Sequence, residues 1–175
     1  MDLDIEELTV SDVKEVSLDK AKKAYSVLKQ PCFVEDSGFY IEAYPNKTNF
    51  PGTLVKRLGI SNNIEALLET MKNIENRNCY FLSCITFYDG ENIKQFMKKS
   101  EGTLSKTIRG EISKSSKSRL WQVFIPKGSN KTLAETSKEE RYNNKENKSS
   151  TEAFVEWYKF NKICQISRKI KTKKI

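Results

Sequence analysis

The amino-acid sequence predicts an α/β fold built on a mixed β-sheet. Helix-like patterns alternate with short apolar segments over the first half of the chain, and a strand pair joined by a tight turn follows. Alternation of helices and strands favours parallel strands, whereas a hairpin favours antiparallel ones, so both together indicate a mixed sheet. With 175 residues in total, we expect one domain over residues 1–167 and a basic C-terminal tail over residues 168–175.

The first helix is expected over residues 18–28. A stripe of apolar residues at three- and four-residue spacing predicts it: Leu18, Ala21, Tyr25 and Leu28. Ser17 is the expected N-cap, and Pro31 ends the helix. The apolar residues 32–34 then predict a short buried strand that ends at residues 35–38.

The middle of the chain is expected to begin with a loop and continue with two helices. Turn-forming residues dominate positions 44–52 and predict the loop. Residues 55–58 and 64–71 have helical patterns, and Asn62 or Asn63 is placed to cap the second of these helices.

The second half of the chain is expected to supply three strands and a helix. Residues 79–87 and 92–98 predict a hairpin, and residues 120–125 predict a further strand. Residues 137–151 contain no aliphatic residue and indicate a loop or a weak helix start. The last helix begins near Thr151, and its expected buried side is Ala153, Phe154, Trp157, Tyr158 and Ile163.

Composition excludes several kinds of chemistry. The chain has no histidine, so Ser-His-Asp triads, Cys-His pairs and His-ligated zinc sites are excluded. Neither of the glycine-rich phosphate-binding motifs G-x-x-x-x-G-K-[ST] and G-x-G-x-x-G occurs, so phosphate chemistry must rest on lysine, arginine and a metal. Four cysteines lie among apolar neighbours without a C-x-x-C pair and indicate free thiols: Cys32, Cys79, Cys84 and Cys164. No apolar run approaches a membrane span and the opening residues are acidic, so we expect a cytoplasmic chain with no membrane contact.

The sharpest local feature is the sequence Glu35-Asp36-Ser37-Gly38, which follows the predicted buried strand. A carboxylate there can hold Mg²⁺ or take a proton from water, and Ser37 or its N–H can contact a phosphate. The alternative is an Asx or Ser turn that only closes the strand. Lys20 and Lys56 are ordinary solvated charges when taken singly, but with Asp36 they form a set suited to metal-assisted hydrolysis of a polyphosphate.

In order and spacing, several stretches of the chain resemble the inosine/xanthosine triphosphate pyrophosphatase family, over residues 4 to about 140. These stretches are Asp4-Ile5-Glu6-Glu7, residues 19–25, residues 33–38, Phe50-Pro51-Gly52-Thr53-Leu54-Val55-Lys56, residues 76–81, residues 124–128 and residues 130–135. The resemblance implies a long twisted mixed sheet flanked by helices, two lobes around a cleft, and a homodimer. It also implies Mg²⁺-dependent cleavage of non-canonical purine nucleoside triphosphates to monophosphate and pyrophosphate.

The resemblance also implies roles for particular residues. Asp36 would be the proton acceptor and a metal ligand, and Glu7 would be a second metal ligand. Ser37 would contact the substrate, and Lys20 and Lys56 would bind the triphosphate. The family's base-pocket motif corresponds to residues 118–124, where Trp121 and Phe124 would meet the base. A further motif of the family, which ends in His-Arg, corresponds to residues 141–147 of this chain, and there Arg141 keeps the positive charge.

Two other hypotheses come from different classes. The first is a catalytically inactive relative that dimerises and binds a nucleotide or nucleic acid, based on the net charge of +8 and the basic residues 168–174. The second is an incomplete gene product, because the family's opening strand and its T-x-N-x-x-K loop would lie upstream of Met1. Loss of that strand would expose an edge of the sheet.

Overall fold

The computed structural model describes residues 12–113, 116, 118–143 and 149–172, and these form one five-stranded sheet in the order β2-β1-β3-β4-β5. The strands are β1 (Cys32–Tyr44), β2 (Lys47–Gly52), β3 (Asn78–Tyr88), β4 (Ile93–Leu104) and β5 (Phe124–Pro126). The α-helices are α1 (Val13–Leu28), α2 (Ile64–Thr70), α3 (Lys138–Asn143) and α4 (Ser150–Thr172). Three short 3₁₀ turns are η1 (Thr53–Val55), η2 (Arg119–Gln122) and η3 (Leu133–Glu135).

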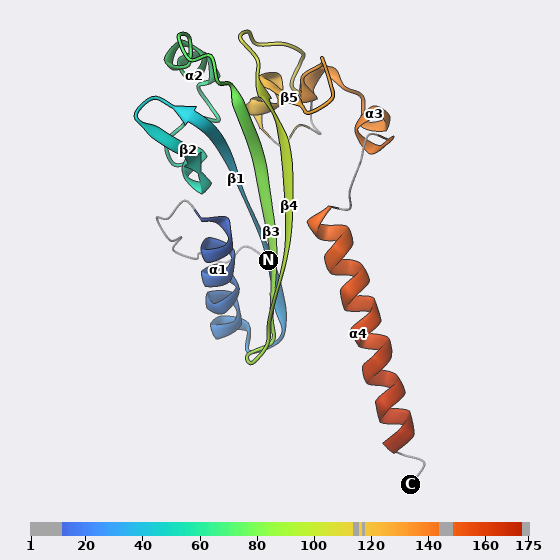
Figure 1. Cartoon of the computed structure of the whole chain (residues 1–175). Helices are drawn as coiled ribbons and strands as arrows, with labels where there is room; N and C mark the ends of the chain where they lie inside the picture. The colour runs from blue at the N-terminus through green and yellow to red at the C-terminus, as the bar shows by residue number, and fades with distance from the viewer. Residues whose placement is uncertain (1–11, 114–115, 117, 144–148, 173–175) are drawn as a thin grey trace.

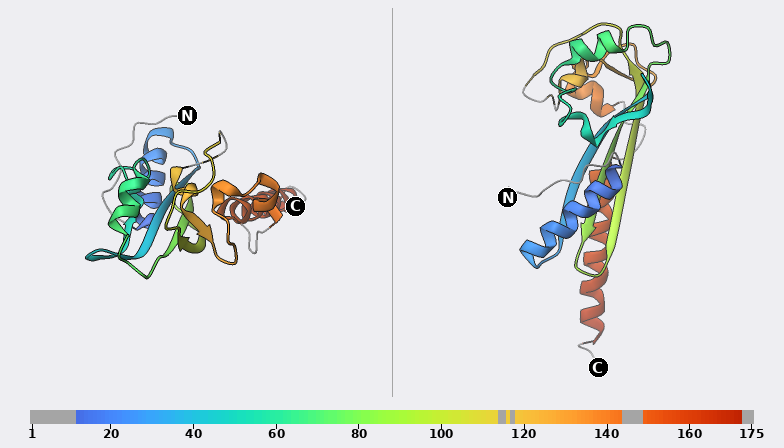
Figure 2. Two further views of the ribbon diagram at one scale, coloured as in Figure 1. Left: turned by 90° about the horizontal axis from the view of Figure 1, so that it is seen from above. Right: turned by 90° about the vertical axis from the view of Figure 1, so that its left-hand side faces the viewer.

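The strands β1, β3 and β4 are long and connect two lobes (Figure 1). The upper lobe contains β2, β5, α2, α3 and the upper ends of the long strands, from Phe39 on β1 and up to Leu82 on β3. The lower lobe contains the rest of β1 and β3, the β3–β4 turn, and the helices α1 and α4. Figures 1 and 2 show α1 and α4 on opposite sides of the lower sheet, so each covers one face of it.

The two covering helices have different interfaces with the sheet. On one face, the Phe154 ring of α4 packs against Phe33 and Phe96, with ring centroids 4.7 and 5.8 Å apart. On the other face, the hydroxyl of Ser17 on α1 contacts that of Thr86 on β3. One interface is therefore aromatic and the other is partly polar.

The upper lobe encloses an apolar core. Its fully buried members lie in β1, β3, β4, β5, α2 and η2 or directly after these helices: Phe39, Ile41, Ile64, Leu67, Met71, Cys79, Leu104, Leu120, Val123 and Phe124. The Phe81 ring lies 4.8 Å from those of both Phe39 and Phe124. Burial of large aromatic and aliphatic side chains on this scale is the main stabilising contribution to a domain of this size.

The α/β class is confirmed, and every pairing among the described strands is antiparallel where a mixed sheet was expected. The reason lies in the connections. β1–β2 and β3–β4 are joined by short hairpins, and α2 lies at the end of the upper lobe (Figure 1) rather than as a crossover between parallel strands.

Several expected elements have different bounds. The strand at Cys32 does not end at residues 35–38 but continues to Tyr44, because Asp36 and Ser37 pair with Cys84 and Ser83 of β3. The loop expected over 44–52 is mostly strand β2, which returns alongside β1. In place of the strand expected over 120–125 there is a 3₁₀ turn and then β5, since Ser118 accepts a hydrogen bond from the Leu120 N–H and starts the turn.

The helices differ less from the expectations. α2 is confirmed, with Asn63 as its cap through the Ala66 N–H. The expected helix over 55–58 is the turn η1 followed by further turns. α1 begins at Val13, and Asp12, not Ser17, caps it. α4 continues past residue 168 to Thr172, so it crosses the expected start of the tail. Among the described residues, no helix is both long and apolar enough to cross a membrane.

Candidate active site

Asp36 lies near the middle of β1, on the face that α1 covers. The Lys20 Nζ of α1 lies 3.3 Å from the Asp36 Oδ2, and the two side chains are only 17% and 15% exposed. The Asp36 Oδ1 accepts a hydrogen bond of 2.8 Å from the Ser37 N–H. The Oδ2 is buried and accepts no hydrogen bond from the described residues, so its contact with Lys20 is a charge contact. The Asp36 carboxylate, one oxygen of which accepts no hydrogen bond from the described residues, is thus held beside the Lys20 ammonium group in a partly buried position.

The helix α1 presents Lys20 because of its pattern of small and branched residues. Val13, Val16, Ala21 and Ala24 are buried against the sheet, and Lys20 lies on the same stripe. A lysine in such a position buries its aliphatic stem and extends its ammonium group toward a polar neighbour, here Asp36. Ser17 also lies on this stripe and is fully buried. The four-residue spacing of Ser17 from Val13 and from Ala21 is a sequence signal that it faces the sheet, although Ser17 was expected to cap the helix.

A close backbone contact brings the second motif to the first. A Cβ on Gly38 would lie 2.8 Å from the carbonyl carbon of Gly52 and 2.9 Å from the Thr53 nitrogen, so only glycine allows this approach. The chain at Gly52 and Thr53 therefore passes directly beside Gly38, and exposed Lys56 follows the turn η1 that begins at this contact. The structure thus brings Asp36, Lys20 and the segment that carries Lys56 to one region.

Ser37 lies on the other face of the strand. Side chains alternate along β1, so that Glu35 and Ser37 are exposed on the face toward α4 while Asp36 faces α1. The backbone N–H of Ser37 is nevertheless part of the site, because it binds the Asp36 carboxylate.

The residues expected to meet the base lie in the upper lobe. The Arg141 guanidinium carbon lies 5.0 Å from the centroid of the Trp121 ring, and Arg141 also donates to the carbonyls of Leu133 and Thr136. Phe124 is 1% exposed and packs against Phe39, which makes it a core residue. Trp121 and Arg141 therefore contact one another but belong to elements other than those around Asp36.

The expected metal ligands are Asp36 and Glu7. Glu7 lies outside the described residues. Within the part of the chain that the structure describes, no group of three or more His, Cys, Asp or Glu side chains gathers at one point. Mg²⁺ is commonly held by one or two carboxylates together with substrate phosphates, and the unsatisfied Oδ2 of Asp36 suits that mode of binding.

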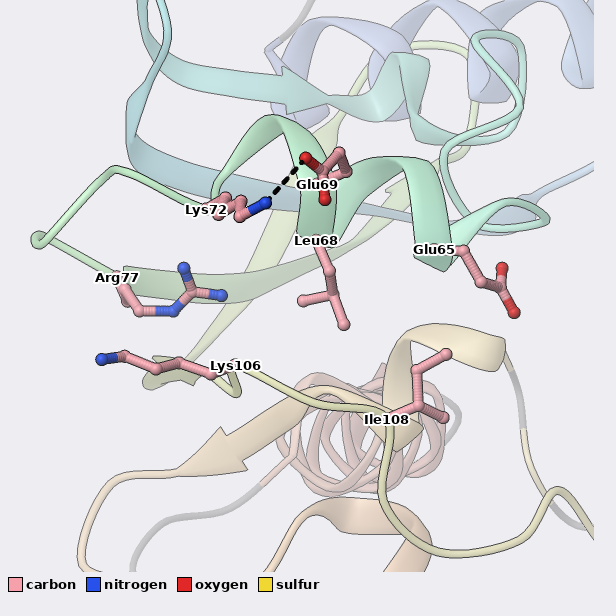
Figure 3. A pocket seen from close by; sticks show the side chains of 7 residues that line it. All are labelled: Glu65, Leu68, Glu69, Lys72, Arg77, Lys106 and Ile108. Atoms are coloured by element: carbon pink, nitrogen blue, oxygen red, sulfur yellow. Dashed lines mark hydrogen bonds and ion pairs between the residues drawn. The ribbon is translucent and has the colours of Figure 1, made fainter.

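A groove of about 410 Å³ lies elsewhere, between α2 and the segment after β4 (Figure 3). Its lining residues are Glu65, Leu68, Glu69, Lys72, Arg77, Lys106 and Ile108, and none of the expected site residues is among them. The guanidinium of Arg77 donates to the carbonyls of Met71, Leu104 and Ser105, and Lys72 pairs with Glu69 at 3.3 Å. Partial burial lowers the pKa of Arg77. Arg77 therefore joins α2 to the end of β4.

Comparison with known proteins identifies the family. The profile of the Ham1 family matches residues 1–157. The chain belongs to the Ham1 family. The dITP/XTP pyrophosphatase of Saccharolobus solfataricus is 33% identical over 135 residues, which are 77% of this chain and 67% of that protein. The dITP/XTP pyrophosphatase of Methanopyrus kandleri is 31% identical over 162 residues, 92% of this chain and 82% of the relative.

A solved Ham1-family structure has the same fold. The Ham1 protein of Staphylococcus aureus superposes with a TM-score of 0.72 at 23% identity, over 92% of this chain and 81% of that one. The resemblance found in the sequence is thus confirmed at the level of family and fold.

Proposed function

We propose that this chain is a nucleoside triphosphate pyrophosphatase that hydrolyses non-canonical purine nucleotides to the monophosphate and pyrophosphate. The observation that carries the proposal is the Lys20–Asp36 pair, on the strand in which Gly38 contacts the backbone of Gly52 and Thr53. Ham1-family membership and the names of the relatives support the enzymatic hypothesis over the inactive, nucleic-acid-binding alternative. The family resemblance stated from the sequence also implies a homodimer, and the free cysteines and acidic opening residues favour the cytoplasm.

In the proposed reaction, Asp36 takes the proton of the attacking water as the bond between the α- and β-phosphates breaks. The ammonium groups of Lys20 and Lys56 bind phosphate oxygens and hold the chain of phosphates in line with that water. In the free protein, Lys20 pairs with Asp36. A triphosphate competes for this ammonium group, and its binding therefore releases the carboxylate for its role as base.

Asp36, with Glu7 as the proposed second ligand, would hold Mg²⁺, which would neutralise charge on the phosphates and on the departing pyrophosphate. The backbone N–H of Ser37 orients the Asp36 carboxylate by binding its Oδ1. Trp121, with the Arg141 guanidinium over its ring, is the proposed contact for the purine base. Phe124 is left out of this set because it is buried in the core.

The test measures pyrophosphate release from dITP and XTP with Mg²⁺. Asp36→Asn keeps the shape of the side chain and removes the base, so we expect at least a ~100-fold loss of kcat. Glu35→Gln is the matched control, because Glu35 is the neighbouring carboxylate on the opposite face of β1. Equal losses of kcat in both variants, or an active Asp36→Asn protein, would show that Asp36 is not the catalytic base.

A further inference from the structure

A chain of hydrogen bonds links α1 to two strands beneath it. The Gln95 Nε2 of β4 donates to the Thr86 Oγ1 of β3 at 3.0 Å and to the carbonyl of Lys14 at 3.0 Å. The Thr86 Oγ1 lies 2.7 Å from the Ser17 Oγ, which lies 3.4 Å from the carbonyl of Cys84. Ser17 and Thr86 are both fully buried.

The donors and acceptors of this chain match in one direction. Gln95 donates to Thr86, and Ser17 has the carbonyls of Cys84 and Val34 within reach as acceptors at 3.4 and 3.5 Å. When Ser17 donates to one of these carbonyls, Thr86 donates to Ser17, and each buried hydroxyl then both donates and accepts. A buried hydroxyl costs free energy unless it is hydrogen-bonded, and a valine or alanine would fill these positions without that requirement. The polar groups must therefore contribute something other than simple packing.

What they contribute is a fixed position for the helix. The rest of the α1 stripe is Val13, Val16, Ala21 and Ala24, whose smooth surfaces bind the sheet without strong directional preference. Hydrogen bonds are directional, and these bind α1 both at its backbone, through Lys14, and at the Ser17 side chain. Together they set where α1 lies along β3.

This anchoring point is next to the proposed site. Cys84, whose carbonyl binds Ser17, is the β3 residue directly opposite Asp36. Lys20 follows Ser17 by three residues on the same helix face, an axial rise of ~4.5 Å. The hydrogen-bond chain and the Lys20–Asp36 contact therefore act on adjacent turns of α1 and adjacent residues of the sheet.

We propose that Thr86, acting through Ser17, is a positioning residue that holds α1 in the place where Lys20 reaches both Asp36 and a bound triphosphate. The proposal rests on the proposed function, in which Lys20 binds phosphate oxygens. Thr86 itself touches neither Asp36 nor the nucleotide in this scheme.

The test is a double-mutant cycle on ligand affinity. The probe is the α,β-imido analogue of dITP with Mg²⁺, whose bond between the α- and β-phosphates resists hydrolysis. We expect Thr86→Val to weaken binding about tenfold in the wild-type background and to have no further effect in Lys20→Met. Thr86→Ser keeps the hydroxyl and should bind like the wild type.

Thr132→Val is the matched control. Thr132 is also fully buried, and its hydroxyl donates to the carbonyl of Arg109 in the upper lobe, so the variant loses a comparable hydrogen bond far along the chain from α1. We expect a similar loss of stability and unchanged affinity. The proposal is overturned if Thr86→Val weakens binding equally in Lys20→Met, if it leaves the affinity unchanged, or if Thr132→Val weakens binding as much.

A second cycle separates this inference from the proposed function. The free energies of unfolding of Lys20→Met, Thr86→Val and the double variant are compared without ligand, and a non-additive result is expected because the two residues act on one placement of α1. If the wild type does not bind the analogue but the unfolding cycle is non-additive, the proposed function fails and the positioning role stands. Additive free energies of unfolding overturn the positioning role.

Discussion

The upper and lower lobes use the same three long strands in opposite ways. The upper lobe packs Phe39, Phe81 and Phe124 ring against ring, and its core is apolar. Where α1 covers the lower lobe, the interface includes buried hydroxyls and the pair of Lys20 with Asp36. Apolar packing stabilises without fixing direction, whereas hydrogen bonds and charges fix direction at a cost in desolvation. The difference indicates that the upper lobe supplies stability and the α1 interface supplies geometry.

The largest effect is expected in the upper core. Phe124→Ala should lower the free energy of unfolding by ~3–5 kcal/mol, because it leaves a cavity among rings that cannot close around it. Phe124→Leu keeps most of the volume and should cost less than ~1.5 kcal/mol. Urea unfolding measures both. If Phe124→Leu abolished binding of the dITP analogue at nearly unchanged stability, Phe124 would be a base contact and the division between the lobes would fail.

Lys20→Met should reduce catalysis much more than it reduces stability. It removes the ammonium group and keeps the buried stem, so we expect kcat/KM for dITP to fall about 100-fold, equivalent to ~2.7 kcal/mol of transition-state binding. Lys22→Met is the control, since Lys22 is exposed on the same helix. Steady-state kinetics measure kcat/KM for both variants. Similar losses of kcat/KM in the two would show a general effect of positive charge rather than a specific role of Lys20.

Gly38→Ala tests the contact between the two motifs. The new methyl group would overlap the backbone at Gly52 and Thr53, which must move away. We expect a loss of ~1–3 kcal/mol in the free energy of unfolding, together with reduced pyrophosphate release. Glu35→Ala, at an exposed position of the same strand, controls for strand propensity. A Gly38→Ala protein with full stability and full activity would mean that the closeness of the two segments has no role.

The smallest effect is a pH dependence that reports on the upper lobe. Burial raises the pKa of Cys79 to about 12 and that of Tyr40 to about 12, from 9.0 and 10.0. Between those values the unfolded chain has lost protons that the folded chain keeps, so stability falls as pH rises from 9 toward 12. By pH 9.5 we expect a loss of about 1 kcal/mol relative to pH 8. Urea midpoints at pH 8 and 9.5 measure it, and Cys79→Val should reduce the slope. An unchanged slope would exclude Cys79 as the source.

Elements set by local interactions were the ones predictable from the sequence. The helix at Ile64 and its cap depend on neighbouring residues alone. The helix was predicted with Asn62 or Asn63 as its cap, and Asn63 is the one that caps it. Glu35 to Gly38 have low strand propensity, and only their pairing with β3 makes them part of a strand, so the sequence predicted a strand end there. Ser118 likewise diverts the segment before β5 into a 3₁₀ turn through one hydrogen bond.

The candidate site was predictable as a set of residues but not as an arrangement. Asp36 and Lys20 were singled out from the motifs, and the structure places them 3.3 Å apart. That Ser37 faces the other side of the sheet follows from the continuation of β1, which the local sequence did not indicate. The prediction of Ser17 as a cap was wrong because the helix begins at Val13, five residues before its expected start. Its partners Thr86 and Gln95 come from strands far along the chain, and no local pattern connects them to it.

The position of Asp36 within a strand, rather than in a loop, also decides which parts of the molecule can move during turnover. The pairing between β1 and β3 runs without interruption from Cys32 to Ile41. The Asp36 carboxylate therefore cannot shift along the sheet unless several backbone hydrogen bonds between the two strands break at once. A shift of one residue would turn it to the opposite face. Any closure around a nucleotide must then be carried by segments outside this ladder, such as the one that bears Lys56, moving against a stationary acid and a helix α1 that its hydrogen bonds hold in place.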